Sequence, residues 1–309
     1  MPLVSPAFHR YVDRAREGRP GLGRLVLGLV LIAVVVALAS AGAVVVALAA
    51  IGAAAVAPEE SARSALSNFF ATPAGIACLL ASFAGMWVGV WLALRLAQRR
   101  PVAGVLGAEG RISWPDFARG ALAALLTGGL SQLVAVLIDP QIGRGEIAVE
   151  AWLAWVPPLA LLILLQSSAE EVVFRGYLLQ SLAARWRHPL VWGGLPTLLF
   201  TLLHLRGHHS AGLTAAGLIG VAAVAGSAVL LVCRSGNLGA AMGLHFGANV
   251  CGILFMSQAD WLNGAALFLG DATDWSEAEL LAFTVLDLAG TGAALGLLLH
   301  RRSPLCLSP

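Results

Sequence analysis

The chain consists of long apolar runs separated by short polar segments. Eight runs come close to the roughly 20 apolar residues that a helix needs to cross a membrane. They lie at residues 25–57, 72–97, 117–138, 151–183, 190–205, 211–233, 237–256 and 278–299. The run at 190–205 contains Gly193, Gly194 and Pro196, so its helix is expected to begin near Pro196, a residue favoured in a first turn. Because strand-like alternation is absent, the pattern predicts an all-α, polytopic transmembrane bundle of about eight spans.

The polar segments between the runs alternate in charge. Arginines gather before the first run, between the second and third runs, and after the fourth, sixth and eighth runs. Acidic residues dominate the other loops, with Arg63, Arg144 and Arg206 as isolated exceptions. Since arginine-rich loops remain on the cytoplasmic side, this alternation predicts that both termini are cytoplasmic.

The amino-acid composition supports a membrane protein and indicates the kind of membrane in which it lies. The chain is 59% hydrophobic and 12% charged, whereas ordinary soluble domains contain about 25% charged residues. No basic tract is suited to nucleic acid, and the four cysteines have no metal-ligand spacing. All 19 basic residues are arginine, which hints at a GC-rich bacterial genome. We therefore expect a multi-pass protein of a bacterial inner membrane, surrounded by membrane lipid and without a nucleic-acid partner.

Three charged side chains interrupt the fourth run: Glu170, Glu171 and Arg175. Each charge at bilayer depth costs at least roughly 2.5–3.5 kcal/mol, so these groups are expected to face a protein interior or a water-filled cavity. Glu171 and Arg175 are four residues apart on one helix face and can form an ion pair. Glu170 is rotated by about 100° and lacks that partner, which suits a general base. These three residues alone are equally compatible with a salt-bridge network that only holds helices together.

Further polar residues occur within the fifth and seventh runs. His204 lies in the fifth run, and His245 lies four residues before Asn249 on one face of the seventh. Both histidines lie roughly 12 Å beyond the expected starts of their helices, so they can meet at one depth. Together with a glutamate on another span, they favour a functional site over plain packing.

Three motifs in this order resemble those of a known family. They are Glu-Glu-x-x-x-Arg at 170–175, Phe-x-x-x-His at 200–204 and His-x-x-x-Asn at 245–249. The resemblance is to the CPBP family of intramembrane proteases, named for CAAX processing and bacteriocin processing, and it covers residues 150–255.

The resemblance implies a role for each polar residue. Glu170 would be the base that activates the attacking water, with His204 holding the water or a metal. His245 and Asn249 would stabilise the oxyanion, and the ion pair beside Glu170 would hold the helix and tune this base.

The sequence leaves the role of a metal open. Glu170, His204 and His245 match the three-ligand set of a catalytic zinc site, although no His-Glu-x-x-His motif is present. The ligands would then come from separate helices. The alternative, which is slightly favoured, is water activated by glutamate and histidine without a metal, so no cofactor is assigned with certainty.

The chain divides into four parts. Residues 1–24 form a cytoplasmic N-terminal segment, and 25–149 form the N-terminal transmembrane helices. Residues 150–256 form the CPBP-like catalytic helical core, and 257–309 form an outer loop, the last transmembrane helix and a cytoplasmic tail. Asp287 lies midway along that last helix and outside the motifs, so we expect a structural role for it.

The leading prediction is an intramembrane endopeptidase that hydrolyses a peptide bond in or beside the bilayer, in a peptide or membrane-protein substrate. The first alternative is a non-catalytic bacteriocin-immunity or scaffold protein that keeps the pocket for binding. The second is an ion-coupled transporter, because transporters also use buried carboxylates and histidines. The lack of an internal repeat counts against the transporter.

Overall fold

The computed structural model describes residues 4–53, 62–205, 210–258, 263–272 and 275–307. Within these residues, six helices are long and apolar enough to cross a membrane: Leu22–Gly52, Pro73–Gln98, Trp114–Ile138, Val149–Ala183, Ala211–Ser235 and Glu277–Leu299. Two shorter apolar helices, Leu190–Leu202 and Gly239–Phe255, occupy the fifth and seventh predicted runs. The prediction of a helical membrane protein is therefore confirmed. The count of eight crossings and the cytoplasmic side of the termini stay predictions.

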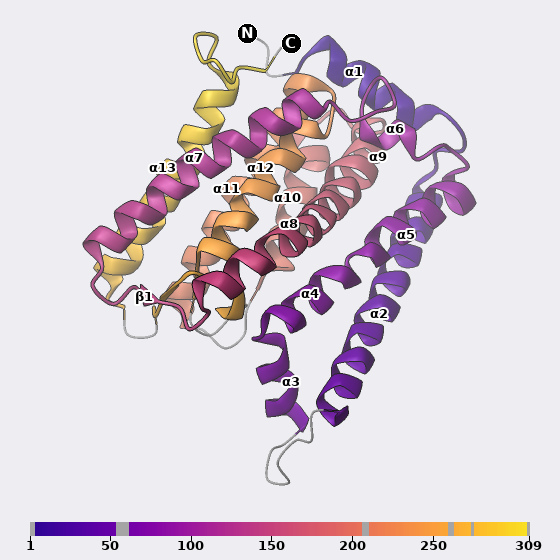
Figure 1. The fold of residues 1–309 in the computed structure, drawn as a ribbon. Helices are drawn as coiled ribbons and strands as arrows, with labels where there is room; N and C mark the ends of the chain where they lie inside the picture. Colours follow the sequence, from indigo (N-terminus) through magenta and orange to yellow (C-terminus); the bar gives the residue numbers. More distant parts are fainter. Residues whose placement is uncertain (1–3, 54–61, 206–209, 259–262, 273–274, 308–309) are drawn as a thin grey trace.

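The N-terminal helices form a pair of rods at one edge of the bundle (Figure 1). The first rod is α2 (Leu22–Ala53), and residues 54–57 of the first predicted run lie outside the described residues. The second rod consists of α3 (Ala62–Phe70), α4 (Pro73–Ser82), α5 (Ala84–Leu92) and the π-helical η2 (Ala93–Gln98). The break before α4 follows from Pro73 and from Thr72, whose Oγ1 accepts a hydrogen bond from the Gly75 N–H at 3.0 Å.

The segment before α2, predicted only as a polar segment, contains a helix. It comprises α1 (Pro6–Asp13) and the 3-10 turn η1 (Arg14–Arg16). One face of α1 is buried, and the helix lies across the end of the bundle (Figure 1). The Tyr11 hydroxyl lies 2.9 Å from the carbonyl oxygen of Val105 and 3.0 Å from that of Arg175. This helix therefore supports the backbone of the charged cluster.

The remaining helices build the core and its second edge. They are α6 (Ala103–Leu106), α7 (Trp114–Ile138), α8 (Val149–Glu171), the π-helical η3 (Val172–Leu179), α9 (Gln180–Ala183), the π-helical η4 (Leu190–Gly194), α10 (Leu195–Leu202), α11 (Ala211–Ser235), α12 (Gly239–Val250), the π-helical η5 (Cys251–Phe255) and α13 (Glu277–Leu299). α8, η3 and α9 follow one another as a single span. α10 begins one residue before Pro196, close to the predicted start.

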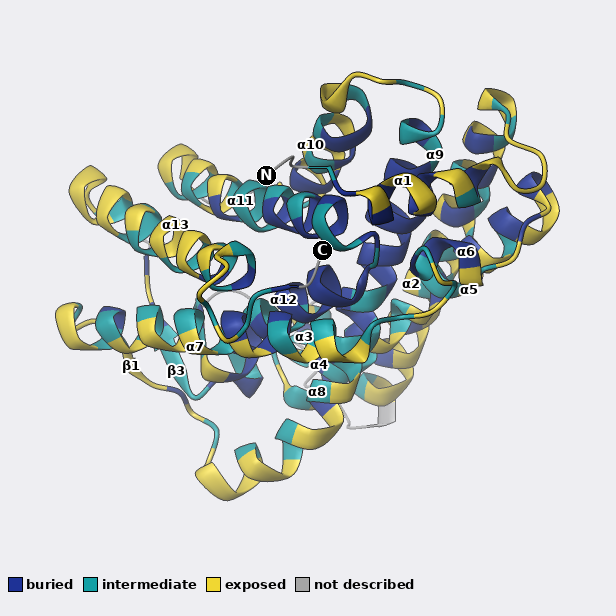
Figure 2. Cartoon of the chain, turned by 90° about the horizontal axis from the view of Figure 1, so that it is seen from above, coloured by how far each residue is buried: buried dark blue, intermediate teal, exposed yellow. Residues whose placement is uncertain are grey.

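α12 lies at the centre of the bundle, and most of its residues are buried (Figure 2). Gly239, Gly243 and Gly247 recur every four residues and face α7. A Cβ at Gly243 would come within 2.0 Å of the Phe117 carbonyl oxygen, so only glycine permits this approach. The close contact with α7 leaves His245 on the side of α12 that meets α8.

A short sheet, which the sequence pattern did not predict, joins the loops at the other end of the bundle. It consists of β1 (Gly143–Arg144), β2 (Met256–Gln258) and β3 (Phe268–Gly270), and the 3-10 turn η6 (Asn263–Ala265) precedes β3. β3 pairs antiparallel with β1 and parallel with β2. Arg144, an exception to the charge pattern, donates hydrogen bonds to the carbonyl oxygens of Leu267 at 2.7 Å and Ile147 at 3.0 Å. Its charge is therefore used to hold these loops together.

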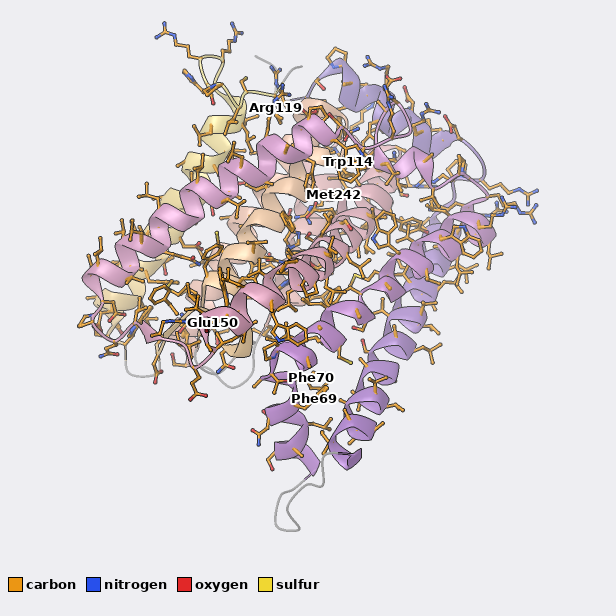
Figure 3. The ribbon with its side chains drawn as sticks, viewed as in Figure 1. Phe69, Phe70, Trp114, Arg119, Glu150 and Met242 are labelled. Atoms are coloured by element: carbon orange, nitrogen blue, oxygen red, sulfur yellow. The ribbon has the colours of Figure 1, made fainter. Side chains whose placement is uncertain are left out.

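Side chains at the two ends of the bundle agree with the predicted alternation of charge. Trp114 and Arg119 lie near the end that holds both ends of the chain, whereas Glu150 lies near the opposite end (Figure 3). These three labelled side chains therefore follow the predicted alternation of charge.

Candidate active site

The charged cluster lies where α8 passes into the π-helical η3. A π-helical turn is wider than an α-helical one and is frequent at functional sites. Glu170, Glu171 and Arg175 are buried there, with 6%, 1% and 1% of their surfaces exposed. Because a buried charge is costly unless it is paired, the partners of these three groups decide what the site can do.

Glu171 and Arg175 form the ion pair that the sequence predicts. Arg175 Nη1 donates to Glu171 Oε1 at 2.9 Å, and its Nη2 donates to the Ala225 carbonyl oxygen of α11 at 2.9 Å. The guanidinium also lies over the ring of Phe200, 4.8 Å from the ring centroid. Among the described residues, Glu171 Oε2 and Arg175 Nε have no hydrogen-bond partner. The pair joins η3 to α10 and α11.

His245 lies between the two carboxylates. Its Nδ1 is 2.9 Å from Glu171 Oε1, and its Nε2 is 3.3 Å from Glu170 Oε2. An ion-paired carboxylate can only accept a hydrogen bond, so Nδ1 is the atom that donates to Glu171. Glu171 therefore orients the imidazole ring so that Nε2 faces Glu170, much as an acidic residue orients histidine in a catalytic triad.

Glu170 does not pair with Arg175, as the sequence predicts, but it has other partners that the sequence did not predict. Besides facing His245, its Oε2 accepts a hydrogen bond from Gln166 Nε2 at 2.6 Å. Gln166 Oε1 in turn accepts from Asn249 Nδ2 at 2.7 Å. Helical spacing separates Glu170 from Arg175, but this spacing does not exclude Gln166 one turn earlier or His245 on another helix. The signal for Gln166 was a polar residue four positions before Glu170 in an apolar run.

These contacts form one connected network across three helices. It runs through Asn249, Gln166, Glu170, His245, Glu171 and Arg175 to the carbonyl oxygen of Ala225. Most members contact two neighbours, so their positions are fixed before any substrate binds.

His204 approaches this network through an aromatic ring. The half-buried His204 donates from Nδ1 to the Phe200 carbonyl oxygen at 2.8 Å, and its ring centroid is 4.6 Å from that of Phe200. The same phenylalanine ring lies edge-on to His245, with the centroids 5.7 Å apart. The two histidines predicted to meet therefore both contact one phenylalanine.

The metal set suggested by the sequence does not fit the side chains as they stand. Among the described residues, no three His, Cys, Asp or Glu side chains come together as metal ligands. His245 has a carboxylate opposite each ring nitrogen, whereas a ligating nitrogen must present its lone pair to the metal. The involvement of a metal stays a prediction.

Asp287 lies apart from the network. It belongs to α13, which packs against α7 and α11. A Cβ added to Gly220 of α11 would come within 2.2 Å of Asp287 Oδ2, so the carboxylate lies against that glycine. It forms no hydrogen bond with the residues that the structure describes.

The site can now be compared with known proteins. A family model described as type II CAAX prenyl endopeptidase Rce1-like matches residues 152–251, which contain all three motifs and the whole hydrogen-bond network. Over these residues the chain is similar to the CPBP family of CAAX proteases, to which this model belongs. This similarity suggests an intramembrane endopeptidase, and the long apolar helices are those of a multi-pass membrane protein.

One relative, whose activity is not characterized, resembles part of the chain. The chain is 32% identical over 117 residues to the uncharacterized protein YyaK of Bacillus subtilis (strain 168). This match covers 38% of the chain and 39% of YyaK. No solved structure matches the chain.

Proposed function

We propose that the protein is an intramembrane endopeptidase in which Glu170 and His245 activate a water for attack on a peptide bond. The observation that carries the proposal is the position of His245, 3.3 Å from Glu170 and 2.9 Å from Glu171. A purely structural bundle gains little from a histidine between two buried carboxylates, because buried charges are costly. Proton transfer, in contrast, needs an imidazole that one carboxylate orients towards a second group.

Glu170 Oε2 and His245 Nε2 can hold one shared proton between them. Before the attack the pair lacks this proton, and Glu170 takes it from water while the water oxygen bonds to the scissile carbonyl carbon. The proton then lies between Oε2 and Nε2. When the C–N bond breaks, the proton passes to the leaving amine, and the carboxyl product completes the hydrolysis. The pair returns to its starting state.

Other side chains position the water and the carbonyl oxygen. The Asn249 amide has a second N–H besides the one that it donates to Gln166, and we assign this N–H to the developing oxyanion. His204 donates its Nδ1–H to the Phe200 carbonyl oxygen, and the family resemblance assigns this histidine to holding the attacking water. His245, an oxyanion donor by the family resemblance, is assigned to proton transfer because both its nitrogens face carboxylates.

The position of the network in the bundle supports a class of substrate. A peptide bond must reach buried side chains at membrane depth, so we propose a peptide or a membrane-protein segment within or beside the bilayer as substrate. A bacterial inner membrane is the proposed location. Prenylation of the substrate is not part of the proposal.

The test starts from cells that make either the wild-type protein or the Glu170→Gln variant. A peptide that accumulates in membranes of the variant cells identifies a substrate, which purified protein in liposomes should then cleave, with and without a chelator. Glu150→Gln is the matched control, because it makes the same change at the exposed first turn of the same helix. If folded Glu170→Gln protein cleaves as fast as wild type, the proposed mechanism is wrong.

A further inference from the structure

A second polar centre lies just after η2. Arg100 is buried there, with 5% of its surface exposed. Its guanidinium bonds only neutral groups: Gln98 Oε1 at 2.7 Å, Gln180 Oε1 at 2.5 Å and Ser181 Oγ at 3.4 Å. No carboxylate among the described residues forms an ion pair with it. A buried arginine is rarely without an anion opposite it, because an unpaired charge is costly to bury.

A cavity adjoins the partners of Arg100. It measures about 370 Å³, and its lining includes Gln98, Ser181, Arg16, Arg185, Leu25 and Pro20. Arg16 and Arg185 are exposed, so they give the cavity a cationic mouth. Arg16 also pairs with Asp13 at the surface, where such a pair contributes little. The inner wall is neutral, and the charge of Arg100 lies directly behind it.

The cavity lies where three candidate membrane spans end. Leu25 is near the start of α2, Gln98 is the last residue of the second span, and Ser181 belongs to the last turn of the fourth. This end of the bundle carries the arginine-rich segments, so it is expected at the level of the cytoplasmic lipid headgroups. Basic pockets between helices at this level are suited to acidic lipids.

We propose that this cavity binds the phosphate-bearing headgroup of an anionic membrane lipid. The forked guanidinium groups of Arg16 and Arg185 match the geometry of phosphate oxygens, and Leu25 and Pro20 provide an apolar wall for the glycerol region. Burial lowers the pKa of Arg100 to about 10, so this residue remains cationic at neutral pH.

The bound lipid would stabilise the helix that carries the candidate active site. Gln180, the partner of Arg100, also donates from Nε2 to the carbonyl oxygens of Tyr11 and Gly104, both at 2.7 Å. Tyr11 in turn contacts the backbone of Arg175. An anionic lipid that offsets the charge of Arg100 therefore stabilises a chain of hydrogen bonds. This chain runs from Arg100 through Gln180 and Tyr11 to the backbone of Arg175. The proposal does not depend on the proposed peptidase activity.

The test uses the purified full-length chain in a neutral detergent. Thermal unfolding is followed during titration with short-chain phosphatidylglycerol, short-chain phosphatidylcholine or inorganic phosphate. Only phosphatidylglycerol should raise the unfolding midpoint at low concentration. Arg16→Gln with Arg185→Gln should bind it about thirtyfold more weakly, because each arginine near the headgroups contributes roughly fivefold.

Two further variants separate a specific site from general surface charge. Arg301→Gln with Arg302→Gln removes two exposed arginines beyond α13, at the same end of the bundle, and should leave binding unchanged (Figure 1). Ala184→Phe, which fills the cavity and keeps every charge, should abolish binding. The proposal is overturned if the control loses as much affinity as the cavity variant, if Ala184→Phe binds like wild type, or if inorganic phosphate stabilises the protein as strongly as the lipid.

Discussion

α12 and α13 each carry an ionisable side chain in an apolar helix, yet the surroundings of the two side chains differ. α12 lies in the middle of the bundle, and its His245 contacts two carboxylates. α13 lies at an edge and is largely exposed, and its Asp287 forms no hydrogen bond with the described residues (Figure 2). A titratable group at membrane depth therefore indicates a functional site when the fold surrounds it with hydrogen-bond partners. Without such partners, the group is weaker evidence for a functional site.

The backbones of the two helices differ in the same way. Gly243 of α12 leaves no room for a Cβ against α7, whereas a Cβ at Gly292 of α13 would meet nothing within 4 Å. Tight packing fixes the position of α12 and thus of His245. α13 has no comparable constraint at Gly292.

The largest expected difference between variants is in the rate of catalysis. Glu170→Gln should lower kcat/KM by about 10³-fold, because general acid–base catalysis contributes about that much. Asp287→Asn removes a carboxylate at membrane depth that lies outside the network, and it should change the rate by less than about threefold. Both values are measured on the peptide that accumulates in Glu170→Gln cells. An equally inactive Asp287→Asn protein would mean that a carboxylate outside the hydrogen-bond network matters as much as Glu170 within it.

The next difference concerns the stability of buried and exposed ion pairs. Glu171→Gln leaves Arg175 buried without its counter-ion, so the free energy of unfolding should fall by roughly 3 kcal/mol. Glu17→Gln makes the same change in the exposed pair with Arg14 and should cost less than about 1 kcal/mol. Unfolding by sodium dodecyl sulfate in mixed micelles gives both values. Equal losses would mean that burial does not strengthen the inner pair.

Helix packing provides a third comparison. Gly243→Ala forces α12 away from the Phe117 carbonyl oxygen and should destabilise the protein by about 2 kcal/mol. Gly292→Ala should be neutral or stabilising by roughly 0.5–1 kcal/mol, because alanine favours a helix where there is room. The same micelle unfolding assay measures both variants, and a stable Gly243→Ala protein would show that α12 can shift without cost.

The smallest expected effect is on the residue that supports Glu170 from one turn earlier. Gln166→Leu removes its hydrogen bond to Glu170 and should lower kcat about tenfold, in line with the loss of one hydrogen bond to a charged group. Gln132→Leu is the matched control, since Gln132 donates to the Cys251 carbonyl oxygen outside the network. A rate loss in the control as large as that of Gln166→Leu would indicate a general structural effect.

Local sequence patterns predicted the helices and one ion pair well. Hydropathy located every apolar run that forms a helix, and the spacing of Glu171 and Arg175 predicted their contact. Both features depend on residues close in the sequence, where helical periodicity determines which side chains are neighbours.

Contacts between distant segments were not predictable in this way. Helical spacing could separate Glu170 from Arg175, but it could not predict the contact of Glu170 with His245, because this contact depends on how α12 packs against α8. The sheet was missed for a similar reason, since its strands are only two or three residues long and come from separate loops. The burial of α1 likewise depends on tertiary packing.

The central claim is that Glu170 and His245 act as one proton-transfer unit, and a double-mutant cycle tests it most directly. We expect Glu170→Gln and His245→Gln each to lower kcat/KM by about 10³-fold. The account predicts that the double variant is about as slow as the slower single variant, because either change alone prevents the two residues from sharing the proton. Losses that multiply to about 10⁶-fold would contradict it, since the two residues would then act independently.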